Sequence, residues 1–517
     1  MALFASACGG DGDEELAALT IGDAPALTVH TSQAAVERGD LGLEEVLERG
    51  EAMFTTSFNT LDGAGRPETT DTSDSNFRPR QEFPNNFNRI SGPDANSCVA
   101  CHSVPRPGGG GDNSSNVFVL ADRFPFVNFD MGEGDGFENL ALDTIGDERA
   151  ALGVFGAGFI EMLAREMTLE LQSIQQEATS EAKSAGAPVT RDLVAKGVSF
   201  GSITTRPDGT IDTSQVDGVD SDLIIKPFMQ KGVIVSLREF VVKALNQHFG
   251  MQAVERFGDG EDPDADSVRD EITRGDVTAL VMFLATFPPP GRVMPPHPEA
   301  RAAAERGEKL FEAIACTTCH IPNLRLNNPV FSEPNPFNPV GKLQVSEVDN
   351  AVTADLTAEG PTPRLKREPD GSVIVPAFTD LKRHDMGDTL NNEPLEQGGV
   401  PTEQWLTRKL WGFANEPPFL HHGRATLISE AIMAHGGEAQ GARDAFDALP
   451  GNDQAAVIEF LKTLRSLPEE GVVGTEDGDG SGAGWFFAGA GTGVTLVLLG
   501  GVAFVFMRRR AAGGSAH

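Results

Sequence analysis

Two short segments of the sequence combine residue types and spacing that can perform specific chemistry. They are Cys98-Val99-Ala100-Cys101-His102 and Cys316-Thr317-Thr318-Cys319-His320. In this arrangement two thiols can add to the vinyl groups of one haem while the adjacent histidine ligates its iron. The spacing is fixed because one helical turn must present all three groups to one macrocycle. The sequence therefore predicts two covalently bound haem c groups, with His102 and His320 as proximal iron ligands.

Other uses of closely spaced cysteine pairs fit this sequence less well. A four-cysteine zinc site usually brings its pairs within a couple of dozen residues of each other, whereas these pairs lie at 98–101 and 316–319. A thioredoxin-like thiol site would accompany a βαβ pattern, which the sequence lacks. Only one cysteine remains, Cys8, so the chain cannot carry a disulfide framework.

An internal repeat indicates the elements that must position the two motifs. Residues 48–54 (ERGEAMF) return as residues 305–311 (ERGEKLF), and each copy precedes one Cys-x-x-Cys-His motif. Each half then ends in a segment whose apolar residues recur with helical spacing, at 277–284 and at 457–464. The repeat predicts two homologous, mostly helical units with one haem motif in each.

The boundaries of these units follow from proline and from polar stretches. Three prolines at 288–290 end the last helix of the first unit. We therefore predict a mainly α fold with two cytochrome c-like haem domains, at 44–290 and 300–468. Long loop insertions are expected in both, one before the first haem motif and one at 323–376.

Both ends of the chain suggest attachment to a membrane. Residues 469–484 read as a flexible acidic linker, and residues 485–507 are long and apolar enough for a transmembrane helix. The basic tail 508–517 is expected on the cytoplasmic side, which would place the haem domains on the periplasmic side of the cell membrane. The leader 1–43 either carries a lipoprotein-type cleavage box ending at Cys8 or holds an inert free cysteine.

The charge of the chain limits its partners. The 517 residues carry a formal net charge of −35, so nucleic acid is excluded as a partner because its phosphates would be repelled. A small cationic electron-carrier protein would be steered toward such a surface, although the same acidity could serve solubility alone. Tyrosine is absent from the sequence, which excludes it as a haem ligand.

Several motifs resemble one known family. They are residues 378–387 (FTDLKRHDMG), 410–412 (LWG), 419–427 (FLHHGRATL), 430–439 (EAIMAHGGEA) and 156–161 (GAGFIE). On these residues the chain resembles the di-haem cytochrome c peroxidase superfamily, in particular its di-haem oxidoreductase or thiol oxidoreductase branch. The likeness covers about residues 45–468. One departure is His422, where the family more often carries aspartate.

The resemblance implies a fold and an activity. The two cytochrome c domains would face each other across a shared interface, and electrons from a small electron-carrier protein or a quinol chain would enter at the C-terminal haem. Peroxide would be reduced to water at the N-terminal haem. Family members also hold Ca²⁺ between the domains, and the acidic loops of this chain could do the same, although it has no twelve-residue calcium loop.

The second axial ligand of each iron decides its reactivity, because a six-coordinate iron transfers electrons whereas an open one binds oxygen species. For the second haem the favoured ligand is His435, with Met386 and Met433 as alternatives. For the first haem no histidine occurs between His102 and His248. The candidates left for the first haem are Met131, Met162, His248, Met251 or no protein ligand.

Glu161 is the candidate catalytic residue. It lies 59 residues after His102, about where peroxidases of this superfamily keep a catalytic glutamate. Such a carboxylate could move a proton between the two peroxide oxygens. The alternative is an ordinary salt bridge.

Three functions remain compatible with these features. The first is a membrane-anchored, exported peroxidase-type oxidoreductase. The second is a non-enzymatic di-haem electron carrier in which both irons are six-coordinate. The third is a haem-bearing subunit of a larger redox complex.

The motifs predict two covalent haems per chain. After extraction with acidified acetone the haem should stay with the polypeptide, because thioether bonds survive this treatment. A pyridine haemochrome assay should then give two haems per chain. A value of one, or haem that extracts freely, would contradict the assignment of one of the motifs.

Overall fold

The computed structural model of the chain describes residues 22–65, 94–111, 114–117, 147–264, 266–358, 364–393 and 396–466. These residues belong to one compact unit. The predicted linker 469–484, transmembrane helix 485–507 and basic tail 508–517 lie outside them, as does Cys8 of the predicted leader.

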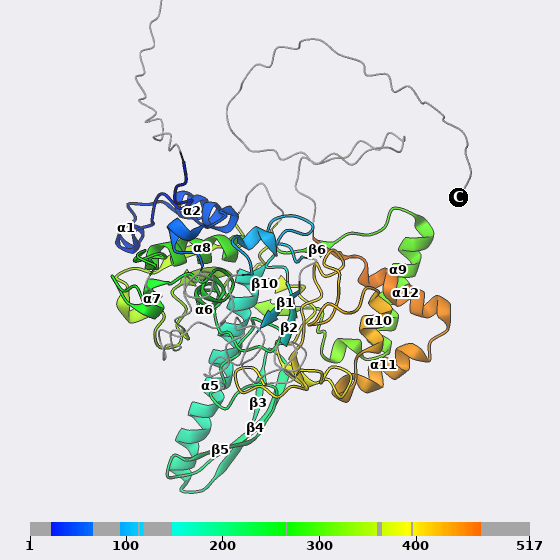
Figure 1. The fold of residues 1–517 in the computed structure, drawn as a ribbon. Coiled ribbons are helices and arrows are strands. Elements are labelled where there is room, and N and C mark those ends of the chain that lie inside the picture. The colour runs from blue at the N-terminus through cyan, green and yellow to red at the C-terminus, as the bar shows by residue number, and fades with distance from the viewer. Residues whose placement is uncertain are drawn as a thin grey trace, which may run out of the picture. The chain divides into compact units, whose positions relative to one another are not determined.

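Ten α-helices lie in the described residues (Figure 1). They are α1 (Gln33–Arg38), α2 (Leu43–Thr55), α5 (Ala157–Ala185), α6 (Leu237–Ala244), α7 (Val254–Phe257), α8 (Arg274–Thr286), α9 (Pro298–Ala313), α10 (Ile428–Met433), α11 (Gln440–Asp447) and α12 (Gly451–Leu461).

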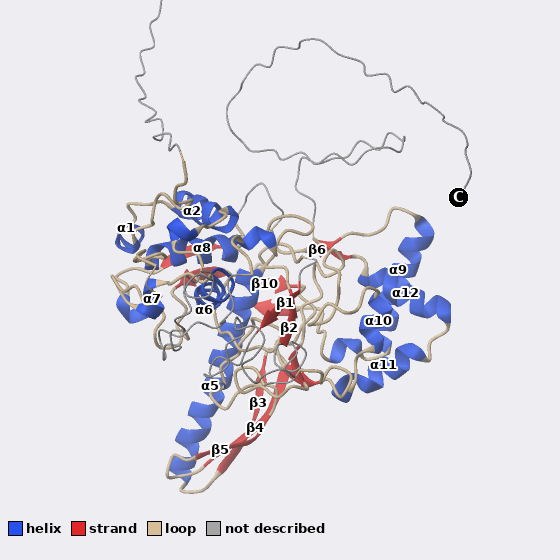
Figure 2. Cartoon of the chain, viewed as in Figure 1, coloured by secondary structure: helices blue, strands red, loops and turns tan. Residues whose placement is uncertain are grey.

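Thirteen strands run between these helices (Figure 2). They are β1 (Ser114–Val117), β2 (Asp147–Ala150), β3 (Val189–Ala195), β4 (Val198–Thr205), β5 (Ile211–Val216), β6 (Gly291–Arg292), β7 (Leu324–Leu326), β8 (Val330–Glu333), β9 (Val352–Asp355), β10 (Val373–Val375), β11 (Arg383–Asp385), β12 (Gln404–Leu406) and β13 (Leu464–Arg465). All pair in antiparallel fashion, as β1–β2, β3–β4–β5, β6–β13, β7–β10, β8–β9 and β11–β12. The prediction of a mainly α fold is therefore wrong.

The sheet β3–β4–β5 shows why that prediction failed. Its first turn is Lys196-Gly197, with φ of +48° and +84°, the left-handed pair that a two-residue hairpin turn requires. In β4, Val198 and Phe200 are buried with exposed Ser199 between them, as in a half-buried strand. The sheet runs beside α5 and packs on it (Figure 1). The β-branched residues and the glycine-containing turn of this segment are typical of strands. The prediction of a mainly α fold followed instead from the helical periodicity of other segments.

Helices α2 and α8 cross at a glycine. A Cβ added to Gly50 would lie 2.6 Å from the Cβ of Phe283 and closer still to the carbonyl oxygen of Ala279. Only a hydrogen atom fits there, so the two helices pack unusually closely. The crossing brings Phe54, one turn further along α2, against Phe283, with 5.6 Å between ring centroids.

The second repeat makes the same contacts. Helix α9 crosses α12 at Gly307, where an added Cβ would lie 2.9 Å from the backbone nitrogen of Val457 and closer to the oxygen of Ala456. Phe311 then packs against Phe460, with 5.4 Å between ring centroids. The repeat in the sequence is thus also a repeat of tertiary contacts.

Two hydrophobic clusters fill the described residues. The larger contains side chains from α2, α5, α6 and α8, and the smaller gathers around Phe311 and Phe460. The larger cluster also takes Leu324, Phe331 and Val375 from the predicted insertion 323–376. This insertion therefore packs on the first half of the chain, while the domain boundaries at 44–290 and 300–468 stay a prediction.

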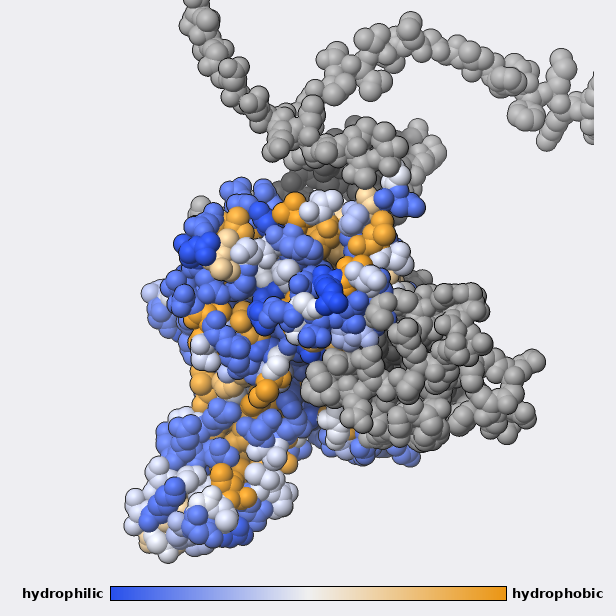
Figure 3. Space-filling model, turned by 60° about the vertical axis from the view of Figure 1, so that its left-hand side comes forward, coloured by the Kyte–Doolittle hydropathy of each residue, from blue (hydrophilic) through white to orange (hydrophobic). Residues whose placement is uncertain are grey.

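No helix in the described residues is long and apolar enough to cross a membrane. The longest, α5, has 29 residues but carries charged side chains along its length. This finding corrects the expected single-pass localisation in the cell membrane; the helix predicted at 485–507 lies beyond residue 466, where the description ends. The face turned forward in Figure 3 is largely hydrophilic, in line with the acidic composition.

The close helix crossings predict how glycine substitutions act. Replacing Gly50 or Gly307 by alanine should lower the free energy of unfolding by about 1–3 kcal/mol, since a methyl group must push backbone atoms apart. Denaturant unfolding of each variant measures this change. Gly441→Ala in α11 is the matched control, because nothing lies within 4 Å of its added Cβ. An equal loss in the control would show that the crossings do not require glycine.

Candidate functional site

Each Cys-x-x-Cys-His segment folds into a tight turn of its own. Cys98–Ala100 and Cys316–Thr318 are 3-10 helices. The backbone N–H of each motif histidine donates to the carbonyl of the first cysteine, at 2.9 Å for His102 and 3.1 Å for His320. The repeat phenylalanines of α2 and α9 lie near the two imidazole rings, at 6.5 and 6.3 Å between ring centroids. Each turn thus gathers two thiols and an imidazole beside a helix crossing.

A backbone carbonyl orients each motif histidine. Nδ1 of His102 lies 3.3 Å from the oxygen of Gly109, and Nδ1 of His320 lies 3.2 Å from the oxygen of Phe378. Burial lowers the pKa of both rings to about 4, so both are neutral at pH 7. A neutral imidazole that donates from Nδ1 offers the Nε2 lone pair, as an axial iron ligand must.

The surroundings of the thiols fit a dithiol redox site poorly. Burial, together with the neighbouring thiol, raises the pKa of Cys98 and of Cys316 to about 12. A cysteine that exchanges disulfides needs a lowered pKa, because the thiolate is the nucleophile. No disulfide involves the four motif cysteines, as addition of their thiols to the vinyl groups of a haem requires.

A large cavity borders His102. Its walls come from the first motif, the start of α5, helix α6, the π-helix Leu245–Phe249 and residues 406–409. The space between the side chains is about 1640 Å³, including its open mouth. The apolar side chains on its walls include Phe54, Val154, Ile160, Phe240, Val241, Leu280 and Leu284. An apolar cavity with two thiols and an imidazole on one wall fits a haem.

The polar groups on the cavity wall also suit a haem site. Gln247 is buried, and its Nε2 finds no hydrogen-bond partner among the described residues. Nδ1 of His248 lies 2.9 Å from Oδ1 of Asp94, and the ring is close enough to His102 to help lower its pKa. Burial lowers the pKa of Lys409 to about 8. Together with Arg408, this lysine offers cationic charge for the carboxylates of a haem.

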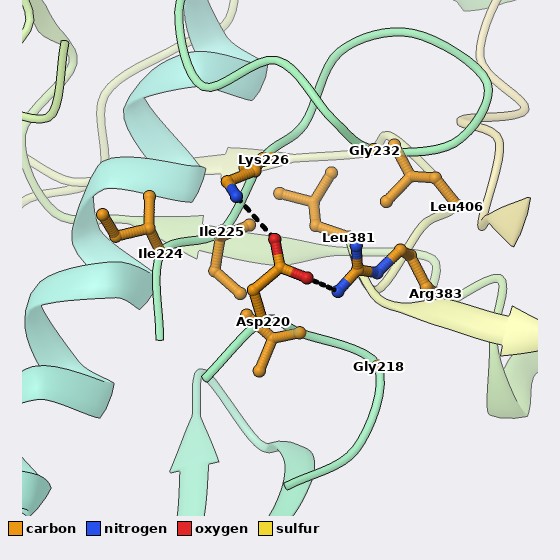
Figure 4. Close-up of a pocket in the computed structure, with 10 residues that line it drawn as sticks. Gly218, Asp220, Ile224, Ile225, Lys226, Gly232, Leu381, Arg383 and Leu406 are labelled. Carbon is orange, nitrogen blue, oxygen red and sulfur yellow. Dashed lines mark hydrogen bonds and ion pairs between the residues drawn. The ribbon is translucent and has the colours of Figure 1, made fainter. Parts of the chain in front are cut away.

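A smaller pocket adjoins this cavity. Leu381 and Leu406 line both spaces. Figure 4 shows Asp220 on its wall between Lys226, at 2.5 Å, and Arg383. Burial alone would raise the pKa of Asp220, but hydrogen bonds from the two cations outweigh it and hold the pKa below its ordinary value. Part of the pocket wall is thus a charged cluster that joins the 218–226 segment to β11.

Of the candidates for the second ligand of the first haem, His248 lines the cavity. Met162 and Met251 are buried in the hydrophobic core and are not among the cavity residues. Met131 lies outside the described residues. Of the candidates that the sequence offered for the first haem, His248 is thus the one that lines the cavity in the described residues, and the identity of the ligand stays a prediction.

A further histidine, His435, lies near the second motif. His435 contributes to the lowered pKa of His320, and its own Nδ1 lies 2.7 Å from the oxygen of Ala431. Its ring is thus fixed in the same way as the motif histidines. The carbonyl of Met386 accepts a hydrogen bond from the residue after His435, while Met433 is 40% exposed. The choice of His435 over Met386 as the ligand stays a prediction.

His384, from the FTDLKRHDMG motif, forms a charged cluster beside the second motif. Its Nε2 lies 2.8 Å from Asp380 and its Nδ1 lies 2.7 Å from Glu438. Burial lowers the pKa of His384, but hydrogen bonds to Asp380, to Cys319 and to Glu438 raise it to about 11. Cys319, Asp380 and His384 lie within 4.8 Å of one another, as metal ligands can. Both ring nitrogens already serve carboxylates, so a cationic imidazolium fits better than a metal ligand.

Glu161 is completely buried and makes structural contacts. Its Oε1 accepts hydrogen bonds from Arg165, at 2.5 Å, and from Asn335, at 2.7 Å. Its Oε2 accepts the backbone N–H of Leu237, at 2.7 Å. Leu237 begins α6 and lines the cavity, whereas Glu161 does not. The catalytic role of Glu161 stays a prediction, and its contacts favour a role in positioning α6.

Aromatic contacts join the two halves at the cavity. Trp405 stacks on His421 with 3.6 Å between ring centroids, and the buried ammonium of Lys231 lies 3.6 Å from the Trp405 ring. The carbonyl of His421 accepts the N–H of Ala150, a cavity residue, at 2.7 Å. Residues of the first half are thus held against β12, whose last residue also lines the cavity.

Sequence reasoning missed part of this site. Lys409 lies in a pair of basic residues directly before the LWG motif, which is a detectable signal in so acidic a chain. No local pattern distinguishes Gln247 from any other helical glutamine. Met229, with φ of +63°, also lines the cavity and belongs to none of the motifs named above.

One comparison with known proteins agrees with the haem chemistry. Residues 355–464 match the model of a family described as "Di-haem oxidoreductase, putative peroxidase". The search of curated proteins found no match. Among the solved structures, one match is a Kuenenia stuttgartiensis hydrazine synthase pressurised with 20 bar xenon. It is 14% identical, covers 58% of this chain and 92% of its own, and has a TM-score of 0.27, which is too low to carry an argument.

The contacts of Glu161 predict the effect of Glu161→Gln. Removing the charge leaves Arg165 buried without its counter-ion, so the free energy of unfolding should fall by about 3 kcal/mol. Denaturant unfolding of this variant, of Arg165→Met and of the double variant measures the coupling. The double variant should recover part of the loss. A 100-fold or larger loss of peroxide turnover with unchanged stability and haem content would instead support the catalytic role.

Proposed function

We propose that the chain is a di-haem c-type oxidoreductase that reduces peroxide at the haem of the first motif. Its electrons would arrive through the haem of the second motif. The observation that supports this best is the difference between the two surroundings. A large cavity borders His102, whereas His320 has His435 nearby with its ring already oriented. Small molecules bind to an open iron, and six-coordinate iron transfers electrons.

Haem iron would supply two electrons for each peroxide, and the protein must deliver the two protons that release two molecules of water. On the cavity wall, His248 is the group suited to hold and move a proton, since Asp94 fixes Nδ1 and leaves Nε2 to exchange it. Nε2 of Gln247 can donate a hydrogen bond to a peroxide oxygen. Lys409 and Arg408 would hold the haem carboxylates.

The electron donor would be a small electron-carrier protein or a quinol chain. A net charge of −35 favours a cationic carrier, because opposite charge speeds association at low ionic strength. The rate of reduction by such a carrier should therefore fall as salt is added.

A second function is favoured by the same cavity. If His248 ligates the first iron, both haems are six-coordinate and the protein is an electron carrier. The proximity of His248 to His102 is the observation behind this alternative. The two functions differ in the spin state of the first haem.

The proposal predicts that wild-type protein has one high-spin haem and that peroxide changes its spectrum. His248→Ala should lower peroxide turnover about 100-fold, the usual contribution of a general acid–base group, and leave the haem content unchanged. Electronic and EPR spectra, together with steady-state peroxide reduction by a reduced cytochrome, measure these effects.

The control is His297→Ala, which removes an exposed histidine at the start of α9 and should leave turnover unchanged. Two low-spin haems in every redox state, with a spectrum that peroxide leaves unaltered, would rule out the peroxidase function. In that case His248→Ala should convert one haem to high spin, as expected for loss of a ligand.

A further inference from the structure

The loop between α7 and α8 gathers four carboxylates. Asp262, Asp264 and Asp266 alternate along the chain, and their side-chain oxygens lie within 4.8 Å of one another. Glu271, just before α8, is close enough for its charge to interact with all three. Like charges at this separation repel one another strongly unless a proton or a cation lies between them.

Two of these carboxylates are buried and keep side-chain oxygens that accept no hydrogen bond of normal geometry from the described residues. Asp264 is 4% exposed, and neither of its side-chain oxygens has a partner within the described residues. Glu271 is 2% exposed; its Oε2 accepts the backbone N–H of Gln252 at 2.7 Å, but Oε1 is unpartnered in the same part of the chain. Burial raises the pKa of Asp264 to about 7 and that of Glu271 to about 10. Buried carboxylate oxygens normally find a hydrogen bond or a cation.

The backbone of residues 262–268 turns around the carboxylates. Ser267 adopts the left-handed region with φ of +76°. Its N–H donates to Oδ2 of Asp262 at 3.2 Å, and the N–H of Val268 donates to Oδ1 of Asp266 at 2.7 Å. Carboxylates at positions 1, 3 and 5, followed by a left-handed residue at position 6, are the arrangement of oxygen-ligand calcium loops. In such loops of twelve residues a glutamate stands at the last position. Here the corresponding glutamate, Glu271, stands at position 10.

The loop is packed against the segments that flank the haem cavity. Through Gln252 it holds the chain just after the π-helix that carries His248. On its other side lies Gly63, where an added Cβ would collide with the side chain of Glu271. A ligand in the loop would therefore tie residues 59–65 and 249–252 to the start of α8.

We propose that Asp262, Asp264, Asp266 and Glu271 form a binding site for one hard divalent cation, Ca²⁺. Four carboxylates and no nitrogen or sulfur ligand select for such an ion, and the irregular loop suits the flexible coordination of Ca²⁺ better than the strict octahedron of Mg²⁺. The site lies wholly within the first half of the chain. It does not depend on the redox chemistry of the haems.

The test uses the full-length, haem-loaded protein after treatment with EGTA and desalting. Isothermal titration with CaCl₂ should give one bound ion per chain, with MgCl₂ binding at least about tenfold more weakly. Ca²⁺ should also raise the midpoint of thermal unfolding, because it binds the folded state alone. Failure of the wild-type protein to bind Ca²⁺ would overturn the proposal.

Variants assign the binding to this loop. Asp264→Asn should weaken Ca²⁺ binding at least about tenfold and, without Ca²⁺, should unfold at a higher temperature than wild type because a buried repulsion is removed. Asp266→Asn, at a less buried position that keeps its acceptor for Val268, should also weaken binding. Asp208→Asn, an exposed aspartate that accepts a comparable backbone N–H from Thr210, is the control. Undiminished binding in both loop variants would overturn the proposal.

Discussion

Each haem motif is held by a pair of helices that cross where one of them has glycine. At Gly50 and Gly307 the partner helix approaches so closely that no side chain fits. This contact sets the position of the repeat phenylalanine four residues on, which packs on the partner helix and near the motif histidine. A larger residue in place of the glycine would separate the two helices. The repeat phenylalanine, which lies near the motif histidine, would then shift. The geometry of both motifs therefore depends on the absence of a side chain at Gly50 and at Gly307.

The two haem motifs share this helix crossing but have different surroundings. Around His102 the long α5, α6 and the π-helix form an apolar wall and leave a large cavity. Around His320 the segment that follows α10 brings His435 close to the motif, and β11 brings the charged cluster of His384 close to it. Two equivalent attachment turns therefore lie in different surroundings, one beside a large cavity and one beside a second histidine. The elements that lie outside the repeat, rather than the repeat itself, make the difference.

Buried charges join the insertion at 323–376 to the first half. Arg238 is fully buried and pairs with Glu255 at 2.6 Å and with Glu333 at 2.8 Å. Glu161 and Arg165 contact Asn335 and Ser332 of the same insertion. Desolvating such ions costs several kcal/mol each, which their mutual attraction must offset. The pairs add little net stability, but losing one partner is costly, so they fix how the insertion docks on α5 and α6.

The sequence alone determined the local chemistry of the chain. The spacing of the two motifs predicted tight turns, and the repeat predicted equivalent elements around them, because both depend on residues close together in the chain. The mixed α and β fold was missed, although the Lys196-Gly197 turn was a readable signal. Glu161, His248 and Gln247 could be placed only by tertiary structure. Which side chain reaches a cavity depends on contacts between segments more than a hundred residues apart, such as that of Glu161 with Asn335. A local sequence pattern cannot predict such contacts.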